Sequence, residues 1–234
     1  MITLKNWVAV FTAAAVALIG GMVLQARSAG AAGLGCQVSL GAGASMSNSS
    51  ARLTDSTTGI EMLSVGGLGA NGGALGVGFG CSIAVDRIML GADIEHVWHN
   101  ATWNAASGPL AVAVELDRQV FLTGRAGVII NDSSVVYMRA GVTKMSTSGL
   151  TGTFTADFGD FSGKVLGGGF EIGIGKHVKL ALDYRHSWFD AKTGVVMDAF
   201  GPAGGNLNLK PEQDLVMLNL IYSLDFFGSV LPVK

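Results

Sequence analysis

The stretch that decides the fold is residues 177–189, which read His-Val-Lys-Leu-Ala-Leu-Asp-Tyr-Arg-His-Ser-Trp-Phe. Its even positions from 178 to 184 are apolar, whereas Lys179, Asp183 and Arg185 occupy odd positions. A period of two residues is typical of a β-strand with one apolar face and one charged face. The pattern by itself leaves open which of the two faces points into the protein.

The composition of the whole chain is unusual for a water-soluble domain. Its 234 residues are 49% hydrophobic and only 14% charged, and they include 35 glycines. After residue 30, however, no uninterrupted apolar run approaches the roughly 20 residues that a membrane-spanning helix needs. The hydrophobic residues are instead spread over short alternating segments. The basic residues are scattered and the net charge is -2, which indicates no nucleic-acid partner.

The N-terminal residues differ from the rest. Lys5 is followed by an apolar run over residues 7–24 and by small residues that end at Ala31. This pattern predicts a secretory signal peptide over residues 1–31, and a retained N-terminal anchor helix is the alternative because the apolar run is long. Cleavage would remove Lys5, Arg27 and no acidic residue, leaving 13 basic against 17 acidic residues.

Eight alternating segments follow the signal. They are residues 36–46, 73–84, 88–99, 113–128, 135–146, 164–175, 178–189 and 214–226. Tight turns at 85–87, 131–134 and 175–177 alternate with long connections at 47–72, 100–112, 147–163 and 190–213. This arrangement predicts an all-β fold, an eight-stranded antiparallel up-and-down transmembrane β-barrel in the outer membrane. The barrel would span residues 32–227, with a short C-terminal tail over 228–234.

Each segment has an apolar face and a polar or glycine-rich face. In residues 113–128 the polar face is expected to carry Glu115, Asp117, Gln119, Thr123 and Arg125. In residues 73–84 the corresponding face carries Gly76, Gly78 and Gly80. A soluble barrel would expose these glycines to water, whereas a narrow eight-stranded barrel has room inside for little but small residues and a few long ones. We therefore expect the apolar faces to point outward into lipid.

Aromatic residues on the apolar faces fall near the segment ends, where outer-membrane barrels carry interfacial aromatic belts. The residues of this predicted belt are Trp98, Tyr184, Trp188, Tyr222 and Phe226.

The inward faces carry charges of both signs. Centring a turn on Asp132 and Ser133 sets Arg125 nearly opposite Arg139, and two arginines there would repel unless acids lie between them. We expect a charged layer that fills the lumen, flanked by Lys179. Its predicted members are Asp93, Glu95, Arg125, Arg139, Glu171, Asp183 and Arg185.

Two further pairs of residues, one of cysteines and one of basic residues, are candidates for specific contacts. Cys36 and Cys81 lie at the periplasmic ends of segments that should be hairpin partners in an exported chain, which permits a disulfide. Arg118 and Lys144 have outward parity near the loop side, a place suited to lipopolysaccharide phosphates, unless they have already entered the loops.

The ordered segments resemble the small outer-membrane β-barrel family, often labelled the porin family, which is similar in architecture to OmpX and the OmpA membrane domain. The matching pieces are residues 38–43, 90–95, 123–127, 168–171 and 178–184. Members usually end in a strand with a final aromatic residue that the barrel-assembly machinery reads. Tyr222, Phe226 and Phe227 match that signal, although Gly228 to Lys234 follow it.

The sequence carries no recognisable catalytic or metal-binding motif. The sequence contains no phosphate-binding loop, nucleophile elbow or zinc motif, so we expect no cofactor, no metal and no enzymatic activity. His96 and His99 should point to opposite faces of their strand, and His186 and Ser187 should do the same. We expect a structural or surface-interaction role. The alternatives are a narrow channel for small or apolar solutes and, less favoured, a lipid-modifying enzyme.

The expected partners follow from this location. They are outer-membrane lipid and lipopolysaccharide, the barrel-assembly machinery during insertion, and an extracellular partner at the long loops.

Overall fold

The computed structural model describes residues 34–107, 110–131, 133–152, 158–198 and 201–224. Within them, nine antiparallel strands form one sheet. The strands are β1 (Leu34–Asp55), β2 (Glu61–Val85), β3 (Ile88–Ser107), β4 (Leu110–Asn131), β5 (Ser134–Gly152), β6 (Phe161–Gly173), β7 (Val178–Phe189), β8 (Lys192–Asp198) and β9 (Gly201–Leu224). No helix of these ranges is long and apolar enough to span a membrane. The predicted signal peptide, Phe226 and the tail lie outside the described residues.

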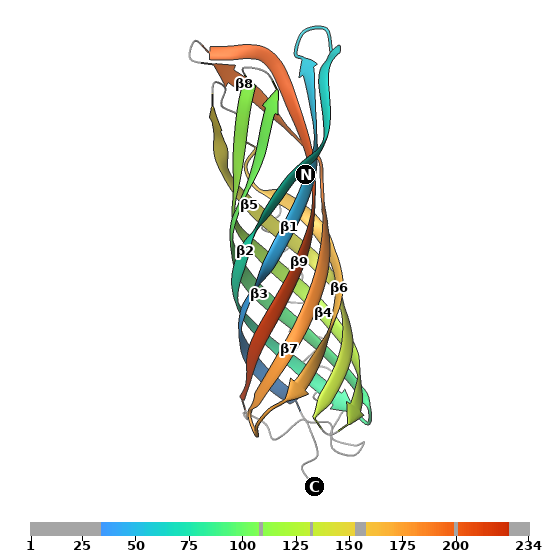
Figure 1. Ribbon diagram of the computed structural model, residues 1–234. Helices are drawn as coiled ribbons and strands as arrows, with labels where there is room; N and C mark the ends of the chain where they lie inside the picture. The colour runs from blue at the N-terminus through green and yellow to red at the C-terminus, as the bar shows by residue number, and fades with distance from the viewer. Residues whose placement is uncertain (1–33, 108–109, 132, 153–157, 199–200, 225–234) are drawn as a thin grey trace.

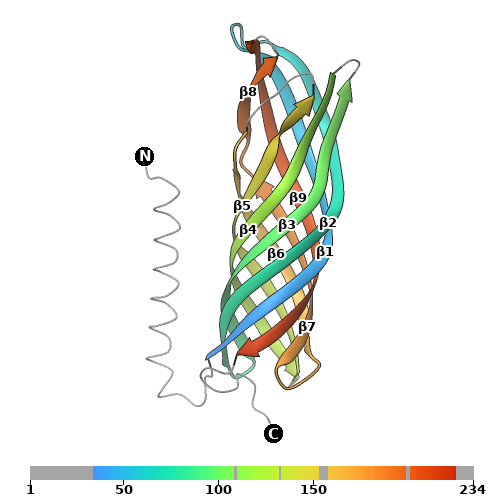
Figure 2. The same ribbon diagram turned by 90° about the vertical axis from the view of Figure 1, so that its left-hand side faces the viewer.

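The sheet closes on itself, as Figures 1 and 2 show. Neighbours follow chain order from β1 to β7, then β9, and β9 pairs back onto β1. The short strand β8 continues the line of β7: β7 pairs with β9 as far as Trp188 and Glu212, and β8 resumes the pairing at Lys192 and Leu209. The wall of the barrel therefore contains eight strands, which confirms the predicted fold.

Short turns lie at one end of the barrel, where β9 also ends (Figure 1). The turn between β2 and β3 is closed by Asp86 and Arg87, and Asp86 has a φ of 54°, as tight hairpin turns require. At the turn between β4 and β5, Arg125 pairs directly with Arg139, which confirms the predicted register. By analogy with other outer-membrane barrels, this end is the periplasmic one.

The opposite, extracellular end differs from the prediction. Residues 47–72 were expected to form a loop, but β1 continues to Asp55 and β2 begins at Glu61. Much of the other predicted loops is likewise strand. The loop interpretation was wrong because small polar residues suit a strand that has left the lipid: Ser47 and Ser49 face inward, and backbone pairing continues past them.

The strands have reversed polarity relative to a soluble barrel. Leu182 is 56% exposed and Leu220 is 49% exposed, whereas Arg125 is 4% exposed and Glu171 is 1% exposed. An apolar surface of this kind around a charged interior is typical of a protein whose outer wall contacts lipid. The stretch quoted at the start is therefore a strand with its apolar face outward, as predicted.

One segment departs from the predicted alternation. The pairing of β4 with β5 shifts between Leu116 and Arg118, and beyond this bulge the two faces exchange. Leu116 is buried in the lumen, whereas Glu115 and Asp117 are exposed outside. The expectation that these two acids point inward was therefore wrong, since one extra residue in a strand turns every later side chain to the other face.

Candidate functional site

The charged layer in the lumen is built by five strands that place long side chains at a common level. Because neighbouring inward residues on a strand are two positions apart, β3 supplies both Asp93 and Glu95, and β7 supplies both Asp183 and Arg185. Strands β4, β5 and β6 supply the remaining members, Arg125, Arg139 and Glu171. The structure brings all seven predicted residues together and buries every one of them.

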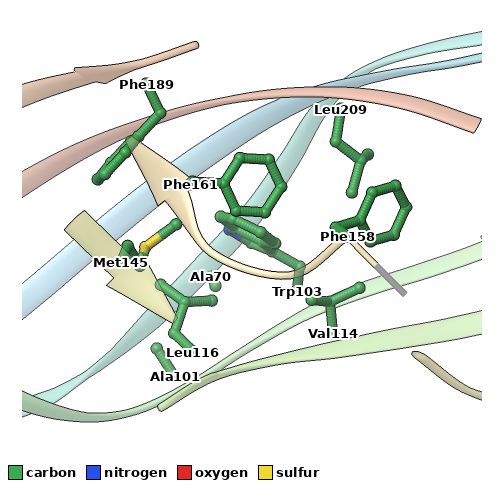
Figure 3. Close-up of a cluster of buried hydrophobic side chains, with 10 residues drawn as sticks. All are labelled: Ala70, Ala101, Trp103, Val114, Leu116, Met145, Phe158, Phe161, Phe189 and Leu209. Carbon is green, nitrogen blue, oxygen red and sulfur yellow. The ribbon is translucent and has the colours of Figure 1, made fainter. Parts of the chain in front are cut away.

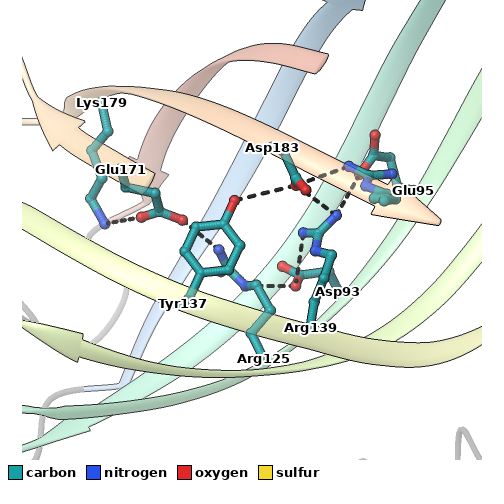
Figure 4. Close-up of polar contacts among 9 residues, drawn as sticks. Asp93, Glu95, Arg125, Tyr137, Arg139, Glu171, Lys179 and Asp183 are labelled. Atoms are coloured by element: carbon teal, nitrogen blue, oxygen red, sulfur yellow. Dashed lines mark hydrogen bonds and ion pairs between the residues drawn. The ribbon is translucent and has the colours of Figure 1, made fainter. Parts of the chain in front are cut away.

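Ion pairs link these side chains around the barrel axis (Figure 4). Arg125 Nε lies 2.7 Å from Asp93 Oδ2, and its Nη1 donates to Glu171 Oε1. Arg139 Nη1 lies 2.9 Å from Asp183 Oδ2. The contact between Arg125 and Glu171 is a charge-assisted hydrogen bond, one of the stronger kinds in proteins, and the other two contacts are ion pairs.

Arg185 completes the ring from β7. Its Nη2 donates to Glu95 Oε2 at 2.6 Å and to Asp183 Oδ2 at 3.2 Å, and its side chain is fully buried. On the periplasmic side, Lys179 Nζ lies 3.6 Å from Glu171 Oε2. Three arginines and Lys179 thus face four carboxylates, so the layer is formally neutral, as buried ionic groups require.

Tyr137 is a central member of this layer and was not among its predicted members. Its ring lies 5.3 Å from Arg125 Cζ and 5.8 Å from Arg139 Cζ, close enough for cation–π contact with both. Its hydroxyl donates to Asp183 Oδ2 at 3.2 Å. Tyr137 and Arg139 both occupy odd positions of β5, and this shared parity was the signal that could have placed Tyr137 in the lumen.

Glycines opposite the layer make room for it. Gly80 pairs with Asp93, and a Cβ at Gly80 would collide with the carboxylate of Asp93. A Cβ at Gly169 would collide with the hydroxyl of Tyr137. The glycine rows on the inner faces of β2 and β6 are therefore needed for space, as the sequence analysis expected of a narrow barrel.

A cavity of about 20 Å³ borders the charged layer on the side of β1, β2 and β9. It is lined by Asp93, Glu95, Arg139, Gln37 and Asn219, among others. A cavity of this size holds about one water molecule. At the level of this cavity, side chains of the described residues occupy most of the lumen.

Above the charged layer the lumen remains filled. A group of mainly apolar side chains that includes Phe121 and Met217 comes first. A polar layer follows, in which His99 Nε2 lies 3.0 Å from Gln119 Oε1, and Gln119 Nε2 donates to Thr143 Oγ1 at 2.9 Å. His99 points inward, while His96 lies on the other face and contacts Trp98, so the two rings point to opposite faces as predicted.

The uppermost part of the lumen is an aromatic plug, shown in Figure 3. We define it as the buried cluster of Ala70, Ala101, Trp103, Val114, Leu116, Met145, Phe158, Phe161, Phe189 and Leu209. Phe158 and Phe161 stack at 6.2 Å between ring centroids, and Lys192 Nζ donates to the carbonyl of Phe158. The two-residue period does not predict this plug, because Phe158 and Phe161 are three residues apart and match no strand period.

The remaining predicted residues that the structure describes lie on the outer face. Cys36 and Cys81 pair directly and are joined by a disulfide near the periplasmic end. Trp98, Tyr184 and Trp188 are exposed toward the extracellular side of the apolar surface, and Tyr222 is exposed at the periplasmic end.

Arg118 and Lys144 also face outward. Arg118 is exposed, and Lys144 Nζ lies 2.6 Å from Asp160 Oδ2. Both residues belong to strands and have not entered loops.

His186 and Ser187 point to opposite sides, as expected for neighbours on a strand. Ser187 is buried in the lumen, whereas His186 Nδ1 lies 2.8 Å from Asp214 Oδ1 on the outer surface. The Tyr184 hydroxyl donates to the same oxygen at 2.6 Å. Ser187 and His186 therefore cannot act together as a nucleophile and its base.

Closed strand pairing, an apolar outer wall and a charged interior together define this protein as a small outer-membrane β-barrel. It lies in the outer membrane. No family model and no curated protein matches the chain.

Solved structures of outer-membrane proteins do match. OprG of Pseudomonas aeruginosa shares 12% identity over 82% of this chain and 97% of its own, with a TM-score of 0.60. The protease OmpT of Escherichia coli shares 7% identity over 81% of this chain and 97% of its own, with a TM-score of 0.48. Ail of Yersinia pestis shares 10% identity over 80% of this chain and 98% of its own, with a TM-score of 0.38. At such identities the likeness to OprG establishes the fold and not an activity.

Proposed function

We propose that this protein is a non-conducting outer-membrane barrel with a structural and surface-interaction role. The observation that carries the proposal is the burial of the ion-paired layer, in which Arg185 is 0% exposed and Asp183 is 1% exposed. A hydrated pore would keep water against these groups. The aromatic plug adds a second barrier above the first.

The length of the strands supports the surface part of the proposal. A tilted strand crosses the hydrocarbon core with about 10 residues, whereas β1 has 22 residues and β2 has 25. Roughly half of each strand therefore stands outside the membrane. At the tip of this hairpin Ile60 and Met62 are largely exposed, and we propose this rim as the part that meets an extracellular partner.

A swelling assay on liposomes that contain the full-length barrel tests the closed lumen. We expect the wild type to admit arabinose no faster than protein-free liposomes. Replacing Glu95, Arg185, Trp103 and Phe161 together by alanine should speed arabinose entry, because two of the layers that fill the lumen are then weakened. Ile60→Ala with Met62→Ala, at the hairpin tip, is the control and should remain closed. Rapid swelling of wild-type liposomes would contradict the proposal.

A narrow channel for apolar solutes is the second candidate, and the aromatic plug is the observation that favours it. All ten residues of the plug are apolar or aromatic, and Trp103 and Phe161 are buried among them. Such a surface could receive a small apolar molecule if the plug side chains moved apart. The same liposomes can be tested for toluene uptake. Uptake that requires the wild-type protein and is lost in Ala101→Trp, where a larger side chain fills the plug, would favour the channel over the closed barrel.

We propose no catalytic role. The separation of His186 from Ser187 supports this view, since a hydrolytic site would need both on one face. Expression of the protein should leave the mass of lipid A unchanged. A new lipid A species that disappears in His186→Ala would show that the protein is an enzyme.

A further inference from the structure

Three cations on the outer surface form a feature that the closed lumen does not explain. We call Arg118 on β4, Lys144 on β5 and Lys164 on β6 the basic belt. All three side chains face outward and are exposed, and they lie on three consecutive strands. A charged side chain on the lipid-facing surface is costly at mid-membrane and is tolerated near the interface.

The strand register places these cations at one height. Arg118 pairs with Ser146, and Lys144 lies two residues nearer the periplasmic end than Ser146. Lys144 in turn pairs with Ser162, and Lys164 lies two residues nearer that end than Ser162. The strands of a barrel are tilted, so residues at equal height on successive strands are offset in this way.

The periplasmic ends of the strands show an offset in the same direction. Ile88, which begins β3, pairs with Val128, although β4 continues to Asn131. Residues at the same height on successive strands are therefore not direct pairing partners. On each next strand, the residue at that height lies nearer the periplasmic end than the direct partner does. The basic belt follows this displacement.

Tryptophan flanks the belt at both ends. Trp98 on β3 pairs directly with Arg118, and Trp188 on β7 pairs directly with Lys164. Both indoles are exposed, and exposed tryptophans mark the level where lipid headgroups begin. By the same offset, Trp98 lies slightly nearer the periplasm than Arg118, and Trp188 lies slightly farther from it than Lys164. The belt therefore lies between two exposed tryptophans, at the headgroup level of the outer leaflet.

The basic belt differs from the other exposed cations of the wall in its grouping. Its three cations lie on adjacent strands, whereas Lys210 on β9 and Arg52 on β1 lie singly, and Arg52 Nε lies 3.2 Å from Glu61 Oε2. Between them, outward positions such as Leu75 and Met46 are apolar, and Asp214 is acidic. The grouping of three cations therefore points to a ligand and not to general membrane anchoring.

Acidic neighbours of the basic belt determine which of its cations are available to a ligand. Asp160 already holds Lys144 at 2.6 Å, and the exposed Asp117 adjoins Arg118 on the side away from the membrane. Arg118 and Lys164, each beside a tryptophan and separated by one strand, are then the two principal anchors. Two cations so spaced match a headgroup with two separate phosphates better than one with a single phosphate.

We propose that the basic belt binds the two phosphates of an outer-leaflet glycolipid of the lipid A type. Arg118 and Lys164 each contact one phosphate, and Trp98 and Trp188 pack beside the sugar and upper acyl chains. The proposal is independent of whether the lumen conducts.

Native mass spectrometry of the full-length barrel in detergent tests the proposal, with diphosphoryl lipid A, monophosphoryl lipid A and phosphatidylglycerol as probes. We expect Arg118→Gln with Lys164→Gln to weaken diphosphoryl lipid A binding about tenfold. Removing one phosphate from the lipid should weaken binding to the wild type and have little further effect on the variant. Charge-preserving Arg118→Lys with Lys164→Arg should retain most of the affinity.

The matched control removes two exposed cations away from the belt, Arg87→Gln and Lys210→Gln, and should bind like the wild type. Equal loss in this control, or equal binding of phosphatidylglycerol and diphosphoryl lipid A by the wild type, would overturn the proposal. The heat-dependent shift of folded barrels on gels reports folding of each variant. If the double variant fails to fold, Lys164→Gln alone must still weaken binding of the diphosphoryl lipid.

Discussion

Arg125 and Arg139 lie directly opposite each other on β4 and β5, and the ring of Tyr137 contacts both guanidinium groups. Two like charges in direct register would destabilise the sheet if nothing lay between them. Asp93 approaches both arginines, at 2.7 Å from Arg125 and 3.6 Å from Arg139. Asp93 thereby offsets the repulsion between the two arginines, which lie at the centre of a neutral layer.

Tyr137→Phe isolates the role of the hydroxyl. The variant keeps the ring between the two arginines but removes the hydrogen bond to Asp183, so we expect a loss of about 1–2 kcal/mol in the free energy of unfolding. Tyr137→Ala also removes the ring and should cost more. Urea unfolding in lipid vesicles, followed by tryptophan fluorescence, measures both. Equal losses in the two variants would show that the ring contributes nothing.

Asp183→Asn tests the neutrality of the layer. Asp183 Oδ2 accepts hydrogen bonds from Arg185 and Tyr137 and lies 2.9 Å from Arg139 Nη1, so neutralising it leaves an uncompensated buried positive charge. The expected loss of unfolding free energy is about 3–5 kcal/mol. Asp190→Asn, at an exposed position just after β7, is the matched control and should change stability little. A stability for Asp183→Asn equal to that of the control would contradict the ion-paired layer.

The disulfide between Cys36 and Cys81 closes a loop with a sequence separation of 45 residues. In the chain-entropy account, a cross-link of that span stabilises a protein by about 4 kcal/mol. We therefore expect a reducing agent to lower the urea midpoint of the wild type and to leave the Cys36→Ser, Cys81→Ser double variant unaffected. An identical midpoint for oxidised and reduced wild type would refute this expectation.

The extracellular hairpin between β1 and β2 should respond to acid. Backbone N–H groups of Thr58 and Thr57, which donate to the Asp55 carboxylate, lower the pKa of Asp55 below its ordinary value of 3.8. A lowered folded-state pKa means that the contribution to hairpin stability is present above 3.8 and is lost as pH falls through the folded-state value. An NMR titration of the Asp55 carboxyl should show a midpoint below 3.8, with faster amide exchange at Thr57 and Thr58 on protonation. A midpoint at or above 3.8 would contradict this turn geometry.

The sequence predicted the membrane-embedded half of the barrel well because lipid imposes a strict rule there. Outward positions such as Leu182 must be apolar, and inward ones such as Asp183 must find partners within the narrow lumen. The register at Arg125 and Arg139 followed from a single short turn. Tyr137 was overlooked only because an aromatic residue on the polar face was not weighed as a partner for charge.

The extracellular half was not predictable in the same way. Outside lipid, strand residues such as Ser47 need only pair through their backbones, so the alternation that reveals a strand weakens. The bulge near Asp117 left no signal in composition, yet it reversed the faces of Glu115 and Leu116. Phe161 begins β6 inside a segment rich in glycine and threonine that resembles a loop. Its burial depends on Trp103 and Phe189, which lie far away in the sequence.

Single-channel recording of the wild-type barrel across a planar bilayer tests the sealed lumen most directly. Side chains packed through both the ion-paired layer and the aromatic plug predict insertion of folded protein with no discrete current steps. Stable, repeated conductance steps that depend on correctly folded protein would contradict the account.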